Sequence, residues 1–145
     1  MGRIAGTHFT WEEALRRSGY TRCPVRLRLN VRRHAKNMER LRAAVNVDRS
    51  HHELHPTGLN VISWIRSPAK NAAVGGARQS RHLRGDACDI AKEEIRRVFP
   101  WRGGLKDFDF IANRIFKNGG FGQYPGGNRH VDSRGYRARW TWWRR

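Results

Sequence analysis

The sequence predicts a single α+β domain in which a small antiparallel sheet is flanked by helices. A long run with helical spacing of apolar residues follows Pro24, and three short strand-like pieces occupy the end of the chain. A chain of 145 residues can bury one core but is too short for two, and we find no repeat or interdomain linker. We therefore treat residues 1–145 as one domain, with 141–145 as a short cationic aromatic tail.

The first half of the chain predicts two helices. Thr10 and Glu13 have the spacing of a capping box, which begins a short helix ending near Gly19. After Pro24, apolar residues recur at steps of three, four and seven, and arginines and lysines fill the other faces. The apolar positions are Leu27, Val31, Met38, Leu41 and Val45. This second helix should pack on the core with a basic exterior, and a polar stretch should follow it over residues 48–58.

The second half predicts strands mixed with short helices. Residues 59–65 have high β propensity and predict a strand. Ser67 and Pro68 begin a short helical turn that glycines 75 and 76 break, and a loop then runs into a strand near Asp89. The remaining elements are helices at 91–98 and 106–116, a turn at 100–104, and strand-like pieces at 121–124, 129–132 and 136–140.

The charge and the cysteines limit the class of protein. A formal net charge of +18 predicts attraction to polyanions such as nucleic acid, anionic lipid, lipopolysaccharide or acidic wall polymers, but it does not identify a reaction. The two cysteines, Cys23 and Cys88, are far apart and indicate neither a disulfide framework nor a thiolate zinc site. Cys88 adjoins Asp89, yet we interpret it as a small buried core residue rather than a nucleophile.

The start of the chain lacks the apolar core of a signal peptide, and no segment approaches the roughly 18 apolar residues of a membrane span. We therefore expect synthesis as a soluble cytoplasmic product.

Three residues suggest a metal centre. The stretch SRHLRGDACDI contains His82 and Asp89, and RHVDSRG contains His130. Two imidazoles and one carboxylate suit a catalytic Zn²⁺, because three protein ligands leave the fourth tetrahedral position open for water or substrate. The spacing of His82 and Asp89 is weak evidence alone, and a single histidine is more often a surface or core residue, which is how we interpret the other histidines.

The surrounding segments closely resemble zinc peptidases of the D-alanyl-D-alanine carboxypeptidase type, which share the hedgehog-like fold with murein endopeptidases. The matching pieces are ISWIRSPAKNAAVGGARQSRHLRGDACDI, GGFGQYPGGNRHVDSRGYRARW and the opening HFTWEEAL. The resemblance covers nearly the whole chain and implies one Zn²⁺ held by His82, Asp89 and His130. It also implies that Arg66 lies beside the metal, where a guanidinium can stabilise a developing oxyanion, and that Ser80 and Tyr124 contact substrate. Arg66 could instead form a structural ion pair, and Ser80 and Tyr124 could be ordinary turn and strand residues.

The general base is the point at which the chain departs from the family. Related enzymes carry an acid three residues before the last ligand or a histidine two before it, and here these positions are Gly127 and Asn128. Asp132 lies two residues beyond His130, on the same side of a strand, and is our candidate base. The alternative is that Asp132 only orients His130 from the outer shell.

The resemblance and the charge together predict a peptidase of bacterial peptidoglycan, as in a bacteriophage endolysin that acts on the host wall in the periplasm after release. We expect a monomer whose basic surface and tail attract it to anionic envelope, lipopolysaccharide or anionic lipid, with no stable nucleic-acid partner. The alternative is a non-enzymatic basic module that binds nucleic acid or anionic envelope and holds a structural metal or none.

Overall fold

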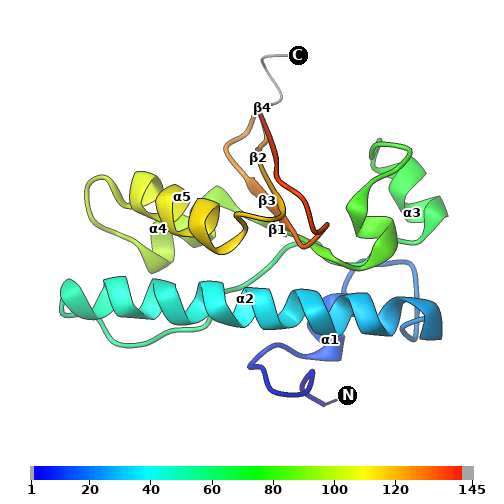
Figure 1. The fold of residues 1–145 in the computed structure, drawn as a ribbon, viewed down its shortest axis with the longest axis horizontal. Coiled ribbons are helices and arrows are strands. Elements are labelled where there is room, and N and C mark those ends of the chain that lie inside the picture. The colour runs from blue at the N-terminus through cyan, green and yellow to red at the C-terminus, as the bar shows by residue number, and fades with distance from the viewer. Residues whose placement is uncertain (1, 142–145) are drawn as a thin grey trace.

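In the computed structural model, which describes residues 2–141, one long helix carries a small sheet on its upper side (Figure 1). Helices α4 and α5 lie beside the sheet at one end and α3 at the other, while α1 and the N-terminal segment lie below the long helix. The elements in chain order are α1 (Trp11–Leu15), α2 (Val25–His51), α3 (Pro68–Ala73), the 3₁₀ helix η1 (Arg81–Arg84), β1 (Ala87–Ile90), α4 (Lys92–Val98), α5 (Gly104–Ile115), β2 (Gly120–Gln123), β3 (Arg129–Asp132) and β4 (Ala138–Thr141). The predicted α+β class is confirmed.

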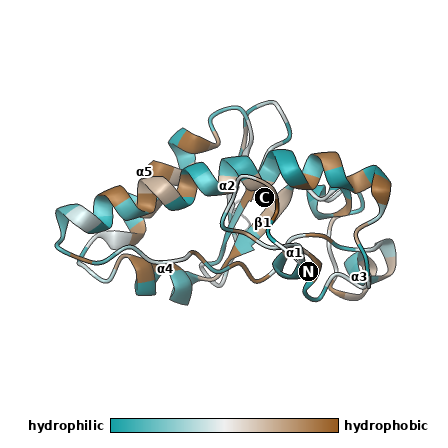
Figure 2. Ribbon diagram, turned by 90° about the horizontal axis from the view of Figure 1, so that it is seen from below, coloured by the Kyte–Doolittle hydropathy of each residue, from teal (hydrophilic) through white to brown (hydrophobic). Residues whose placement is uncertain are grey.

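The helices in the first half follow the expected local signals. The Thr10 hydroxyl accepts from the Glu13 amide at 3.1 Å and the Glu13 carboxylate accepts from the Thr10 amide at 2.7 Å, so the predicted capping box begins α1. Helix α2 buries the five predicted apolar positions and presents a mostly hydrophilic outer face (Figure 2). It continues to His51, beyond Asp48, where a polar stretch was predicted. No described helix is long and apolar enough to span a membrane.

The prediction of a strand over residues 59–65 is wrong. This segment forms only an isolated bridge between Ser63 and Asp89. Beyond that bridge the Ile65 amide donates to the Ala14 carbonyl and the Arg66 amide to the His82 carbonyl, so the backbone leaves the sheet to join α1 and η1. The apolar character of the segment reflects burial in the core, as at Trp64.

The sheet is mixed rather than wholly antiparallel. Its strand order is β1-β3-β2-β4, with antiparallel pairing of β3 to β1 and to β2. Strand β4 pairs in parallel with β2, because the chain after β3 crosses over before it returns to the sheet at the far edge. The tail predicted at 141–145 begins inside β4, where Thr141 pairs with Gln123, and residues 142–145 lie outside the described residues.

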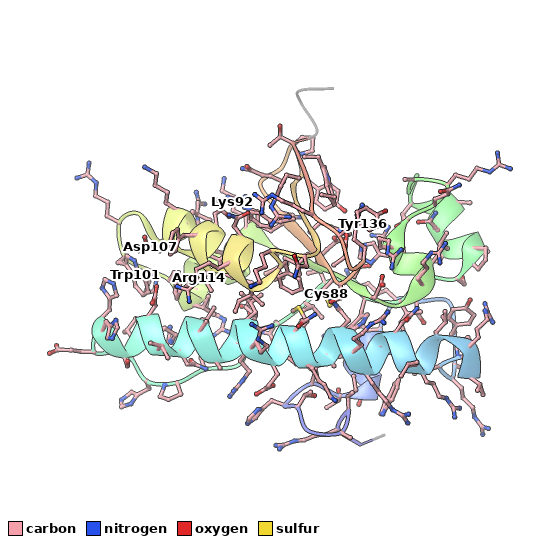
Figure 3. All side chains as sticks on the ribbon, viewed as in Figure 1. Cys88, Lys92, Trp101, Asp107, Arg114 and Tyr136 are labelled. Carbon is pink, nitrogen blue, oxygen red and sulfur yellow. The ribbon has the colours of Figure 1, made fainter. Side chains whose placement is uncertain are left out.

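The two faces of the sheet have different roles. Cys88 and Val131 are cross-strand partners and are fully buried, and Cys88 lies between the sheet and α2 (Figure 3). Burial raises the pKa of the Cys88 thiol well above its ordinary value, which fits core packing and opposes a nucleophilic role. Because side chains alternate along a strand, the neighbouring Asp89 projects from the opposite face. That face carries the candidate site.

Candidate metal centre

His82, Asp89 and His130 come together in the fold as the sequence predicted. Each offers one ligand atom, and these atoms lie within 4.8 Å of one another. Asp89 on β1 is the direct cross-strand partner of His130 on β3, and residues opposite each other in a sheet present side chains on the same face. His82 enters from η1, whose cap residue Ser80 accepts a hydrogen bond from the His82 amide at 3.3 Å.

The protein fixes the orientation of His82 through its backbone. Nδ1 of His82 lies 2.6 Å from the Trp64 carbonyl oxygen, and a carbonyl only accepts, so Nδ1 carries the hydrogen. This turns the other ring nitrogen, Nε2, toward the carboxylate: it is fully buried, lies 3.1 Å from Asp89 Oδ2, and forms no hydrogen bond of normal geometry with any described residue. In a neutral imidazole held in this way Nε2 carries the lone pair, which is the arrangement of a metal-ligating histidine whose other nitrogen donates to an outer-shell carbonyl.

His130 uses its two ring nitrogens in the opposite way to His82. Its Nε2 donates to Asp132 Oδ2 at 2.8 Å, and its Nδ1 lies 3.1 Å from Asp89 Oδ1 and 3.3 Å from the Tyr124 hydroxyl. The nitrogen facing Asp89 is therefore Nδ1. Burial alone would lower the pKa of His130, but its hydrogen bonds to Asp132 and Asp89 raise it above the ordinary value.

The carboxylate of Asp89 is stabilised in its charged form. Burial alone would raise its pKa, and the adjacent imidazoles of His82 and His130 reverse this and hold the pKa well below the ordinary range. Both shifts have the same cause, which is the close approach of imidazole nitrogens and carboxylate oxygens in a buried place. Two imidazole nitrogens and a carboxylate oxygen fit Zn²⁺, so His82, Asp89 and His130 are the residues that would hold it.

Arg66 lies against the proposed metal ligand Asp89. Its Nη2 is 2.9 Å from Asp89 Oδ2, and its Nε donates to the Ser63 hydroxyl at 3.2 Å. Arg66 also lines a groove of about 770 Å³ with Ser80, Tyr124 and His130. An ion-pair role and a role toward substrate are thus compatible, because the Arg66 side chain both contacts Asp89 and lines the groove.

Tyr124 joins the centre more closely than the sequence suggested, since its hydroxyl donates to Asp89 Oδ1 at 3.2 Å. Burial, followed by the neighbouring charge of Asp89, raises the pKa of Tyr124 above its ordinary value, so the phenol remains protonated.

Asp132 lies on the same side of β3 as His130, as predicted, but behind it. The carboxylate is fully buried and accepts from His130, from the Gly120 amide at 2.9 Å, and from Arg134 at 2.6 and 2.8 Å. Burial alone would raise its pKa, and the Arg134 and His130 hydrogen bonds instead hold it well below the ordinary value. Because both oxygens of Asp132 are occupied and lie on the far side of His130, the structure favours the orienting role. Which of the two roles Asp132 has stays a prediction.

Two partners of the site were not predicted from sequence. The Trp64 carbonyl is a backbone group and leaves no signal in the side-chain pattern. Arg134 had a signal, since it stands two residues after Asp132 in RHVDSRG. The space for these groups comes from Gly120 and Gly122 on β2, where an added Cβ would lie 2.1 Å from the Asp132 carboxylate and 2.1 Å from the Trp140 ring.

Comparison with known families agrees with this geometry. The family model of peptidase M15 matches residues 8–99, nearly two thirds of the chain, and this range includes His82 and Asp89. A search of curated proteins gives no significant match. The matched segment contains the first two predicted ligands, and the fold supplies His130 from outside it. The chain therefore belongs to the peptidase M15 family, the zinc-dependent peptidases of the D-alanyl-D-alanine carboxypeptidase type.

Proposed function

We propose that this zinc peptidase hydrolyses peptide bonds of bacterial peptidoglycan. The observation that carries the proposal is the groove beside the metal centre, which four arginines line: Arg66, Arg81, Arg84 and Arg134. No aspartate or glutamate is among its described lining residues. Three of these arginines are paired with buried aspartates, Arg66 with Asp89, Arg81 with Asp86 and Arg134 with Asp132, which fixes their guanidinium groups at the groove wall. Fixed guanidinium groups and Arg84 beside peptidase ligands suit a peptide that carries carboxylates, and peptidoglycan stem peptides are of this kind.

The chain's own residues divide the work at this centre. Zinc held by His82, Asp89 and His130 would polarise the scissile carbonyl and activate water. Arg66 is fixed by Asp89 and Ser63, so its guanidinium is oriented before substrate arrives and can stabilise an oxyanion without reorganisation. Ser80 positions His82 and lines the groove, and Tyr124 places its hydroxyl at the ligand atoms.

We assign Asp132 to the support of His130. A carboxylate whose oxygens already accept from two side chains and a backbone amide is poorly placed to take a proton from the groove. It can still increase the basicity of His130 and fix its ring, as outer-shell carboxylates do.

We further propose a role in lysis, as in a bacteriophage endolysin that is made in the cytoplasm and reaches the wall after release. The net charge of +18 supports this, because a basic enzyme is concentrated on anionic wall and envelope polymers. In this proposal the envelope partner is lipopolysaccharide or anionic lipid. The protein acts as a monomer and has no stable nucleic-acid partner.

The test uses purified peptidoglycan, a chelator and mass spectrometry of the released peptides. Hydrolysis should stop with the chelator and return with zinc. The product masses would distinguish cleavage at L-alanyl-D-glutamate, D-alanyl-meso-diaminopimelate or terminal D-alanyl-D-alanine. Zinc binding without any hydrolysis would contradict the substrate and leave the basic binding module as the better description.

A further inference from the structure

A second hollow lies away from the metal centre and has no part in the proposed function. It has a volume of about 500 Å³, and its lining includes the apolar side chains Trp11, Leu15 and Cys23. Three arginines, Arg22, Arg28 and Arg32, also line it, and we call these three its rim. Apolar walls with a guanidinium rim suit a ligand that is both apolar and anionic.

Two exposed aliphatic side chains extend this apolar surface. Val25 is 75% exposed and Leu29 is 71% exposed, the highest values among the exposed large hydrophobic residues of the described chain. They are four apart on α2, and each is three residues from Arg28 or Arg32, so they are helix-surface neighbours of the rim. Single exposed apolar residues need no explanation, but a pair beside an apolar hollow forms a patch.

The charge around the patch is predominantly positive, and the acidic residues next to it are Glu12 and Glu13, which follow Trp11. From Ala14 to Met38 the chain contains eight arginines and lysines and no aspartate or glutamate. Arg32 stacks over the Trp11 ring at 5.7 Å, and Arg28 donates to a backbone carbonyl at Cys23. Among the described residues, no carboxylate forms a salt bridge with Arg22, Arg28 or Arg32. These guanidinium groups remain available to an external anion.

We propose that this surface, the α2 lipid face (Trp11, Arg22, Cys23, Val25, Arg28, Leu29 and Arg32), binds the surface of an anionic phospholipid bilayer. Val25 and Leu29 enter the boundary between headgroups and acyl chains, the hollow takes part of one acyl chain, and the arginines bind headgroup phosphates. Nucleic acid has phosphates but gives exposed aliphatic side chains no apolar partner. This inference assigns the envelope attraction proposed above to a defined surface. It rests on the proposed function for the idea that the protein meets a bacterial envelope, but not on peptidase activity.

The position of the face also has a functional meaning. Among the described residues, those that line the hollow and those that line the substrate groove are two separate sets with no member in common. A protein bound through the α2 lipid face would therefore keep the groove residues out of that contact.

The first test separates the apolar contact from net charge. The full chain is sedimented with phosphatidylcholine vesicles with and without phosphatidylglycerol, and the double variant Val25→Ser/Leu29→Ser is compared with Val47→Ser/Phe110→Ser. The control removes side chains that are 56% and 64% exposed elsewhere, and neither variant changes the charge. We expect at least about tenfold weaker binding to phosphatidylglycerol vesicles for the first variant and little change for the control, since each buried CH₂ contributes about 0.8 kcal/mol. Equal binding by both variants would overturn the proposal.

The second test separates a defined site from diffuse attraction. Arg22→Gln/Arg28→Gln and Arg96→Gln/Arg102→Gln each remove two positive charges, and only the first pair lines the hollow. Equal loss of vesicle binding would show general attraction by the charge of +18 and refute the site. Loss of binding to a short DNA duplex by Arg22→Gln/Arg28→Gln, with vesicle binding unchanged, would make the face a polyanion site and refute the lipid assignment.

The result is independent of the proposed substrate. If the proposed function holds, these variants should hydrolyse purified peptidoglycan as the unchanged protein does, because none alters the metal centre or its groove. If the unchanged protein fails to hydrolyse peptidoglycan, the proposed substrate is wrong, while the vesicle comparison still decides the lipid face.

Discussion

Replacing Asp132 by Asn distinguishes the two roles of this buried residue. The carboxylate accepts hydrogen bonds on both oxygens, from His130 Nε2 and Arg134 Nη2 on Oδ2, and from the Gly120 amide, the Arg134 amide and Arg134 Nε on Oδ1. An amide has only one accepting oxygen. Three donors point at the Oδ1 position and two, His130 Nε2–H and Arg134 Nη2, at the Oδ2 position. The amide oxygen should therefore take the Oδ1 position, which turns the NH₂ group toward His130. The substitution therefore loosens His130 without removing a metal ligand.

The expected magnitude follows from this loss. Removing an outer-shell partner of a ligating histidine weakens metal affinity by about 10–100-fold, or about 1.4–2.7 kcal/mol. We expect zinc affinity, measured by competition with a chromogenic chelator, to fall by this amount in Asp132→Asn. Turnover with saturating zinc should fall much less than the roughly 10²–10⁴-fold that loss of a general base costs.

Asp107→Asn is the matched control. Asp107 accepts from the Trp101 indole at 2.8 Å at the α5 end of the molecule, so it is also an aspartate with a side-chain donor (Figure 3). Its substitution should leave zinc affinity unchanged. Unchanged zinc affinity in Asp132→Asn, together with a loss of turnover of about 10²–10⁴-fold, would refute the orienting role and restore Asp132 as the base.

Four further predictions test other parts of the molecule. His82→Ala should lose bound zinc and hydrolysis together, whereas His55→Ala, an exposed histidine, should lose neither; zinc content measured by mass spectrometry decides this. Arg66→Lys keeps the charge but not the planar fork, so turnover should fall with zinc content intact, and unchanged kinetics would reduce Arg66 to a structural ion pair. Burial lowers the pKa of His34 from 6.5 to about 3, so the unfolded chain binds a proton that the native state does not, and stability falls as the pH drops below about 6.5. By pH of about 4.5 this should cost about 2–3 kcal/mol in urea unfolding with a chelator present, a loss that His34→Leu should remove; an equal acid dependence in both proteins would contradict it. Deleting residues 141–145 should spare hydrolysis of purified peptidoglycan and reduce killing of whole cells in a salt-sensitive way, and a parallel loss of both with a lower Tm would make the tail structural.

The elements that local chemistry determines were predictable from sequence. The capping box at Thr10 and Glu13 and the helical spacing of apolar residues after Pro24 depend on neighbours a few positions away, and both formed as expected. The segment 59–65 did not, because strand propensity cannot reveal that Ile65 and Arg66 pair with α1 and η1 instead of a strand. The parallel pairing of β4 likewise depends on a crossover that strand patterns do not encode.

The candidate site was predictable to a similar degree. His82, Asp89 and His130 were found from residue type and family context, and their convergence is confirmed. The position of Asp132 behind His130 could not be read from a two-residue spacing, which fixes the side of the strand but not the direction of the carboxylate. The role of the Trp64 carbonyl was inaccessible for a simpler reason, since every residue has a carbonyl.

The two glycines of β2 are positions at which the site should not tolerate substitution, although neither is a proposed metal ligand. Gly120 and Gly122 are the cross-strand partners of Asp132 and His130. The space that a side chain at Gly120 would need is filled by the Asp132 carboxylate, and the corresponding space at Gly122 is filled by the Trp140 ring. Alanine, the smallest change, would add one carbon and displace the Asp132 carboxylate or the Trp140 ring. During natural drift or directed evolution, these positions should therefore admit fewer substitutions than the arginines that line the groove. Screens that mutate only ligands and groove residues would overlook them.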